Sequence, residues 1–260
     1  AWHEGVTATL PDDGANLGGR IAVIADVGPM EVYYDAFDAL GEVDLVVSLG
    51  DWPYADKAPA AHTLDEFRAK HRQSRLTAPV QRLLARAPII ATCDDHDITD
   101  NWDGATSPEL VETGLVAWAE FLPRADATRT YRRWRWGQHL EVFVLDTRRY
   151  RSANDAPDDA SKTMLGAAQL AWLLDGLATS TATYCVVFSS VPLDFTGSVD
   201  TWESFTTERA QVLAALDPAR TIVVSGDQHY FAAQVHGSGL REYVCSSIAA
   251  GPGSRSSTIE

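Results

Sequence analysis

The sequence predicts an α/β protein, because short apolar runs alternate along the chain with segments of helical periodicity. Seven runs rich in Val and Ile have the length and flanking residues of buried strands: residues 21–25, 45–49, 89–92, 140–145, 184–189, 221–224 and 241–245. Six segments place apolar residues at helical spacing: residues 32–40, 64–76, 79–87, 108–121, 167–177 and 207–216. The polar stretch 152–163 is expected to be a surface loop, and the tail 251–260 is expected to fray.

The composition supports one folded domain over residues 1–260. Hydrophobic residues make up 45% of the chain and charged residues 22%, which is enough to build a sizeable core. The formal net charge of −15 argues against non-specific binding to nucleic acid or to anionic membranes. No stretch is long enough to span a bilayer. The chain begins with Ala1 and not with Met, so the lack of a visible signal peptide excludes nothing.

Four of the predicted strands run directly into acidic or histidine side chains. These residues are Asp26, then Asp51 after Gly50, then Asp94-Asp95-His96-Asp97, then Asp227 and His229 after Gly226. In α/β sheets, ligands gather outside the carboxyl ends of the strands, so these groups are expected to converge. Each has an alternative: a single Asp at a strand end can cap a helix or form a turn. The run of four titratable residues is harder to explain without cations nearby.

The order of these motifs resembles that of the calcineurin-like metallophosphoesterases. Tyr54, three residues after Asp51, is similar to the purple acid phosphatases and to the PhoD-like (alkaline phosphatase D) branch. Further matches point to the PhoD-like branch: Asp100-Asn101-Trp102, residues 145–151 with Arg148 and Arg151, Leu165-Gly166 with Gln169, and Ser225 to His229. The resemblance covers roughly residues 21 to 250.

This resemblance implies a four-layer α/β/β/α sandwich with a centre of two metal ions. The first metal would be held by Asp26, Asp51, Tyr54 and His229, a set that suits Fe(III). The second would share Asp51 and take Asp95 and Asp227. Because these second ligands are all oxygen, Ca²⁺, Mg²⁺ or Mn²⁺ suits them better than Zn²⁺.

Two positions depart from the family pattern. PhoD-like proteins often have a Cys near the first motif, where this chain has Asp26, as in the purple acid phosphatases. The wider superfamily has a His two residues before a Pro in the fourth motif, where this chain has Ser190 before Pro192. A neutral hydroxyl is a poor ligand, so the second site is expected to be harder and weaker.

The implied reaction is hydrolysis of a phosphate ester by a metal-activated hydroxide. By motif, His96 would contact a phosphoryl oxygen or protonate the leaving group, Asp97 would orient His96, and Asn101 would contact the phosphate. Arg148 and Arg151 would clamp the phosphate, with an internal ion pair such as Asp146 with Arg148 as the alternative.

The sequence leaves several alternatives open. The substrate is expected to be a small phosphomonoester or phosphodiester, and the rival is a catalytically inactive metal-binding protein of the same fold. The compartment stays open, although the resemblance is compatible with an exported protein, periplasmic or secreted.

Trp202 and Phe205 would form either a lid or core, and the Trp134 to Trp136 stretch fits a half-buried hairpin better than a nucleic-acid surface. Arg68, His71, Arg72 and Arg75 are predicted to form one solvated helix face, and Cys93, Cys185 and Cys245 to be buried small residues.

Overall fold

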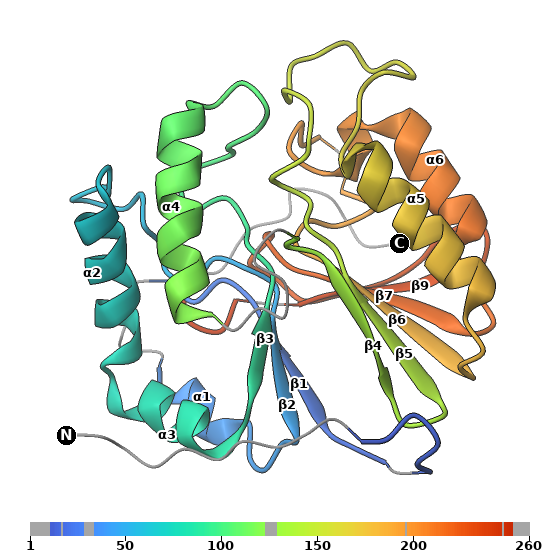
Figure 1. Ribbon diagram of the computed structural model, residues 1–260, viewed down its shortest axis with the longest axis horizontal. Coiled ribbons are helices and arrows are strands. Elements are labelled where there is room, and N and C mark those ends of the chain that lie inside the picture. The colour runs from blue at the N-terminus through green and yellow to red at the C-terminus, as the bar shows by residue number, and fades with distance from the viewer. Residues whose placement is uncertain are drawn as a thin grey trace.

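The structure is a computed structural model that describes residues 11–16, 18–28, 34–122, 129–195, 197–245 and 247–251. Its elements form four layers, with two sheets face to face in the middle (Figure 1). Helices α1 to α4 cover one outer face, and α5 and α6 cover the other. This is the predicted α/β/β/α arrangement, and the prediction of one domain over residues 1–260 stays a prediction.

The first sheet contains three parallel strands in the order β1-β2-β3. Their bounds are β1 Ile21–Ile24, β2 Leu45–Ser48 and β3 Ile89–Ala91. Ile24 pairs with Ser48, and Ser48 pairs with Ala91, so the three carboxyl ends are level. The loops that follow these strands therefore start from the same edge of the sheet.

The second sheet contains six strands in the order β4-β5-β6-β7-β9-β8. Their bounds are β4 Arg132–Trp136, β5 Leu140–Val144, β6 Tyr184–Ser189, β7 Thr221–Ser225, β8 Ala232–Val235 and β9 Arg241–Val244. The central strands are parallel, whereas β4 and β8 pair antiparallel with β5 and β9. A single bridge between Ala25 and Ser247 links the two sheets at the carboxyl end of β1.

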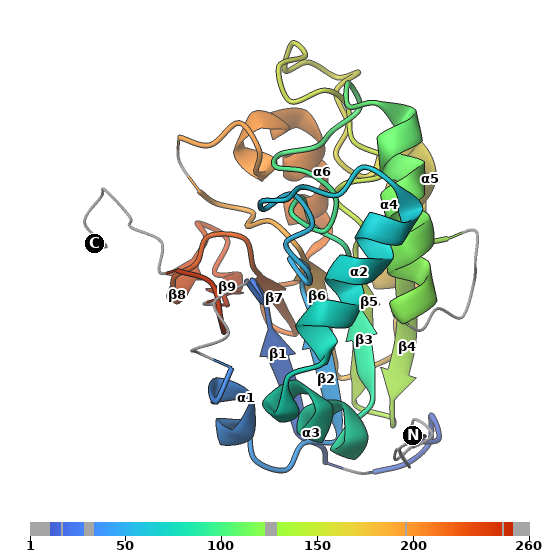
Figure 2. The same ribbon diagram turned by 90° about the vertical axis from the view of Figure 1, so that its left-hand side faces the viewer.

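The helices connect the strands over the two outer faces. Their bounds are α1 Ala36–Ala39, α2 Leu64–Arg75, α3 Ala78–Arg86, α4 Pro108–Phe121, α5 Gly166–Thr179 and α6 Thr206–Ala215, with a 3₁₀ turn at Trp202–Ser204. Figure 2, seen from the side of α2 and α4, shows both helices in front of the strands. Thr63 begins α2 with a capping box, in which Thr63 and Glu66 satisfy each other's backbone N–H groups.

The core between the sheets is built from β-branched and aromatic side chains of both sheets. Leu45, Val47 and Leu49 from the β2 region pack with Val142, Val144 and Phe188 from β5 and β6. All of these side chains are buried. Their contact holds the two sets of strand ends at a fixed separation, and this positions the loops that carry the polar residues.

The predicted elements are confirmed with small shifts at their ends. The hairpin at Trp134 is the β4-β5 pair, and Trp202 and Phe205 are fully buried core. The first helix is shorter than predicted. Residues 32 and 33 of its predicted span lie outside the described residues, and so do residues 252–260 of the predicted frayed tail. Strand β8 was not predicted, because its sequence Ala-Ala-Gln-Val is short and shows no alternation of apolar and polar residues.

The predicted solvated face of α2 is wrong for two of its four residues. His71 is fully buried and stacks on Phe121, with ring centroids 4.9 Å apart. Arg75 lies over the ring of Trp52 at 4.7 Å and contacts the His71 ring. A guanidinium can pack on aromatic rings while its charge stays solvated at one edge, so charge alone did not predict exposure.

The three cysteines are free, and two of them, Cys93 and Cys185, are buried. In the described part of the chain, no helix combines the length and the apolar composition that crossing a membrane requires.

Candidate metal centre

The six predicted ligands come together where the strands of both sheets end. Asp26 follows β1, Asp51 and Tyr54 follow β2, Asp95 follows β3, and Asp227 and His229 follow β7. Gly50 makes this approach possible: its φ is +111°, and a Cβ there would lie 2.3 Å from the Cβ of Asp94. The second and third loops can therefore pack against each other only through a glycine.

Backbone conformation marks the same residues. Among the described residues, five non-glycine residues have positive φ, and every one is a predicted site residue: Asp26, Asp51, Asn101, Asp227 and His229. Each such conformation costs up to roughly 1–3 kcal/mol, although Asp, Asn and His tolerate it best. The fold therefore aims these side chains against local preference, which is typical of functional sites.

The first ligand group consists of Asp26, Asp51 and His229, whose ligand atoms lie within 4.8 Å of one another. The phenol oxygen of Tyr54 lies 2.7 Å from Nε2 of His229. Nδ1 of His229 donates to the carbonyl of Gly251 at 2.8 Å, which leaves Nε2 as the acceptor that faces the group. Burial lowers the pKa of His229, so the ring is neutral and suited to ligation.

The second ligand group consists of Asp94, Asp95 and Asp227, again within 4.8 Å. Asp51 also lies within 4.8 Å of ligand atoms of Asp95 and His96, so it adjoins both groups, as expected of a bridge. Asp94 was not among the predicted ligands, although it stands in the acidic run that pointed to this loop. The Ser190 hydroxyl donates to Oδ1 of Asp94 at 3.0 Å, so Ser190 supports this group through a carboxylate.

The residues present fit cations. One carboxylate oxygen each of Asp26, Asp51 and Asp94 is buried and has no hydrogen-bond partner among the described residues. A buried oxygen without a donor is costly, and a cation would satisfy it. Hard oxygen donors with one imidazole are the ligands that Fe(III), Ca²⁺, Mg²⁺ or Mn²⁺ accept.

The carboxylates raise one another's pKa. Burial, followed by the charges of neighbouring aspartates, raises the pKa of Asp26, Asp51 and Asp227 well above the ordinary range. Burial also raises the pKa of Asp94 to about 6, against the opposing charge of Arg148. Asp95 behaves differently, because the charges of Arg148 and His96 outweigh its burial and lower its pKa to about 2. Without bound cations, the cluster therefore favours protonated carboxyl groups.

Asp97 does not orient His96, which corrects the sequence-based prediction. Its carboxylate accepts hydrogen bonds from the backbone N–H groups of Asp51, Trp52 and Asp94 at 2.8–3.1 Å. Burial raises its pKa to about 7 despite these donors. Asp97 therefore joins the second loop to the third.

Asp56 holds His96 instead. Its Oδ2 accepts from Nδ1 of His96 at 2.6 Å and from the backbone N–H of Asp100 at 3.1 Å. The His96 ring stacks on Tyr54, with ring centroids 4.4 Å apart. Burial lowers the pKa of His96, but the hydrogen bond to Asp56 and the charge of Asp95 outweigh it, so the net shift is upward. Only a turn that the sequence does not reveal brings Asp56 here, five residues after Asp51.

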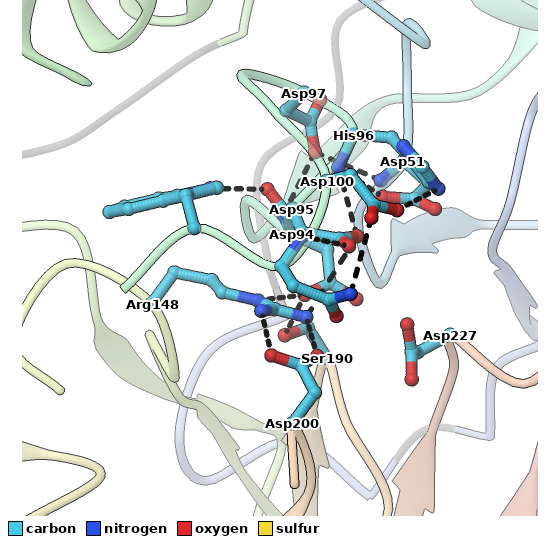
Figure 3. Close-up of polar contacts among 12 residues, drawn as sticks. Asp51, Asp94, Asp95, His96, Asp97, Asp100, Arg148, Ser190, Asp200 and Asp227 are labelled. Atoms are coloured by element: carbon cyan, nitrogen blue, oxygen red, sulfur yellow. Dashed lines mark hydrogen bonds and ion pairs between the residues drawn. The ribbon is translucent and has the colours of Figure 1, made fainter. Parts of the chain in front are cut away.

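Arg148 and Arg151 each form internal ion pairs, which is the alternative to phosphate binding. Their partners are not the expected Asp146. The Arg148 guanidinium is fully buried between Asp94 and Asp200, and it binds Asp200 through two nitrogens at 2.6 and 2.7 Å (Figure 3). Arg151 also binds Asp200, at 2.8 Å, and its side chain is buried. Asp146 accepts from the backbone N–H groups of Arg148 and Arg149 and does not pair with the Arg148 guanidinium. Neither guanidinium is exposed to a substrate.

Asn101 lies beside the centre and contributes through its backbone. Its N–H donates to Oδ2 of Asp95 at 2.8 Å, while its side-chain amide donates to Asp100 at 3.3 Å. The side chain is exposed, so contact with a phosphate stays a prediction.

The two facing sheets and the acidic centre at their edge are those of a metallophosphoesterase fold. The sequence matches the PhoD-like phosphatase family over residues 23–258, and the chain belongs to that family. It is 26% identical over 284 residues to alkaline phosphatase D of Bacillus subtilis (strain 168), across 86% of this chain and 48% of that protein. The chain thus spans about half the length of this curated relative.

Two solved structures share the fold. One, described as the structure of PhoD, superposes with a TM-score of 0.81 at 24% identity, over 94% of this chain and 59% of that chain. The other, a dimetal phosphatase from Danio rerio, gives a TM-score of 0.62 at 14% identity, over 90% of this chain and 89% of that chain. They confirm the predicted four-layer sandwich.

We predict that Arg148→Met lowers the free energy of unfolding by about 3–5 kcal/mol, because it leaves Asp94 buried without its cation and leaves Asp200 with Arg151 alone. Arg149→Met is the matched control, since Arg149 pairs with the exposed Glu112 and its loss should cost at most about 1 kcal/mol. Urea denaturation of both variants measures the difference. Equal stabilities would show that the Arg148 network does not hold the acidic cluster.

We also predict that the metal-free protein becomes less stable as the pH rises from about 4 to 7. The lowered pKa values of His71 and His229 oppose this trend, but the raised pKa values of five aspartates outnumber them, so the folded state binds more protons than the unfolded state in this window; these are Asp26, Asp51, Asp94, Asp97 and Asp227. The free energy of unfolding should fall by roughly 1–3 kcal/mol per pH unit. Urea denaturation at pH 5, 6 and 7 with a chelator measures the slope, and added Mn²⁺ or Ca²⁺ should flatten it. A slope of opposite sign with the chelator would contradict the cluster's electrostatics.

Proposed function

We propose that this chain is a metal-dependent hydrolase of phosphate esters with a centre of two metal ions. The observation that carries the proposal is the convergence of buried, unpartnered carboxylate oxygens with Nε2 of His229 and the Tyr54 phenol, which hydrogen-bond to each other. Membership of the PhoD-like phosphatase family supports the same reaction class. The substrate is a phosphomonoester or phosphodiester.

The ligand chemistry supports different ions at the two positions. Asp26, Asp51, Tyr54 and His229 would hold the first. Burial and the charges of Asp51 and Asp26 raise the pKa of Tyr54 far above its ordinary value, so only a highly charged cation such as Fe(III) would displace its proton. The second ion would be held by Asp51, Asp95 and Asp227, with Asp94 beside them. This all-oxygen set suits Ca²⁺, Mg²⁺ or Mn²⁺.

Bound there, the two cations would supply an activated water and would neutralise charge on the phosphoryl oxygens. The chain itself supplies the proton for the leaving group. Asp56 fixes a proton of His96 at Nδ1 and raises the pKa of the ring, which favours the cationic form whose Nε2–H is available for donation. Asn101 stands beside Asp95, where its exposed amide can contact the phosphate.

An inactive metal-binding protein of the same fold remains the second candidate, and one observation favours it. The Ser190 hydroxyl hydrogen-bonds to Asp94 and to Thr147, and as a neutral oxygen it is a weaker ligand for the second ion than the imidazole that the wider superfamily has at this position. A weakly held second ion would leave the first in place without the reaction.

Metal analysis combined with hydrolysis of p-nitrophenyl phosphate and bis-p-nitrophenyl phosphate separates the two candidates. We expect two ions per chain, and a loss of one ion together with activity in Asp51→Asn, because Asp51 adjoins both ligand groups. Asp175→Asn, an exposed change on α5, should retain both. A wild-type chain that binds one ion and stays inert after iron, Ca²⁺, Mg²⁺ and Mn²⁺ are supplied would favour the inactive candidate.

We further predict that His96→Gln lowers kcat by roughly 10²–10⁴ for an alkyl phosphate but much less for p-nitrophenyl phosphate. A nitrophenolate leaves without a proton, whereas an alkoxide needs one. His62→Gln, an exposed change, is the control. Equal losses for both esters would mean that His96 positions the phosphate and does not act as an acid.

A further inference from the structure

A cavity of about 370 Å³ lies beside the first ligand group. It is enclosed by the residues that follow Asp26, by the loop from Pro53 to Ala60 and by one face of α2. This volume falls in the range of roughly 300–1,000 Å³ that small-molecule sites occupy. The cavity is larger than a phosphate group requires, and it has no role in the proposed metal and proton chemistry.

The cavity and the metal centre share a wall. Tyr54, whose phenol oxygen lies 2.7 Å from His229, also lines the cavity. Val27 and Gly28, which follow Asp26 directly, line it as well. An ester whose phosphoryl group lies at the ligand groups can therefore extend its organic part past Tyr54 into the cavity.

The lining combines apolar surface with two cations. Val27, Pro53, Pro59 and the rings of Tyr34 and Tyr54 provide flat apolar walls. Of the three lysines in the sequence, two line this cavity, Lys57 and Lys70. In a chain of net charge −15, two lysines at one cavity indicate that the cavity is suited to an anionic group.

Among the described residues, no carboxylate fully neutralises either lysine. The Lys70 ammonium donates to the backbone carbonyl of Lys57 at 2.5 Å, which gives it an anchor but no opposite charge. Lys57 is half exposed and lies 4.0 Å from Asp56, whose nearer oxygen already accepts from His96. Glu66 also lines the cavity, but it accepts the N–H groups of His62 and Thr63 at the start of α2.

We propose that this cavity is a subsite for the organic part of the substrate, and that it selects esters whose leaving group is a flat apolar unit carrying a second negative charge. The apolar walls and the two aromatic rings receive the flat unit. Lys57 and Lys70 receive its charge. The subsite rests on the proposed phosphoesterase function and specifies its substrate class.

The test compares phenyl phosphate with 4-carboxyphenyl phosphate, which differ by one carboxylate on the ring. For the metal-loaded protein, we expect a kcat/KM ratio in favour of the carboxylated ester. Lys57→Ala and Lys70→Ala should each lower this ratio about twofold to fivefold, the effect of an exposed ion pair. Ala69→Trp, which places an indole in the cavity, should abolish the preference. Arg72→Ala removes an equal charge from α2 outside the cavity lining and should leave the ratio unchanged.

A binding measurement separates this proposal from the proposed function. Calorimetric titration with benzylphosphonate and 4-carboxybenzylphosphonate requires no turnover. Tighter binding of the carboxylated compound, lost in the two lysine variants, would support the subsite even in a protein that hydrolyses no ester. Equal binding of the two compounds by the wild type would overturn the proposal. Lysine variants that weaken the binding of both phosphonates equally would also overturn it, because the lysines would then act on the phosphonate group.

Discussion

The mutual repulsion of buried aspartates is the constraint on which the rest of this structure depends. Asp26, Asp51, Asp94, Asp95 and Asp97 are each at most 2% exposed, and they lie in neighbouring loops. Charges at this separation in a protein interior repel strongly. A fold that brings them together must supply positive charge, donate hydrogen bonds or leave some of them protonated.

The chain uses each of these means at a different carboxylate. Arg148 supplies the positive charge to Asp94 and, from 3.8 Å, to Asp95. Backbone N–H groups surround Asp97, so it joins two loops. The remaining unpartnered oxygens belong to Asp26, Asp51 and Asp94, and they face the ligand groups. Hydrogen bonds and Arg148 thus compensate part of the cluster's charge, and the unpartnered oxygens are left to protonation or to a bound cation.

Tyr54 connects the parts of the site. Its oxygen faces His229, its ring stacks on His96, and the same side chain lines the cavity that contains Lys57. A change in the charge state of this phenol is therefore felt by His229, by His96 and by the wall of the cavity. Under the proposed function, this one side chain would influence metal binding, acid catalysis and substrate fit.

The sequence by itself determined most of the strands and helices, because hydrophobic periodicity is a local pattern, although it missed β8. Polar residues at strand ends predicted that the loops would converge, and the resemblance to the PhoD-like branch implied the six ligand positions. The sequence also indicated the family, since five motifs occur in order. Only the tertiary structure decided that Asp56, and not Asp97, holds His96, and that Arg148 pairs with Asp94 and Asp200. Which of several nearby charges pair depends on distances set by loops packing against each other, and that packing leaves no periodic trace in the sequence.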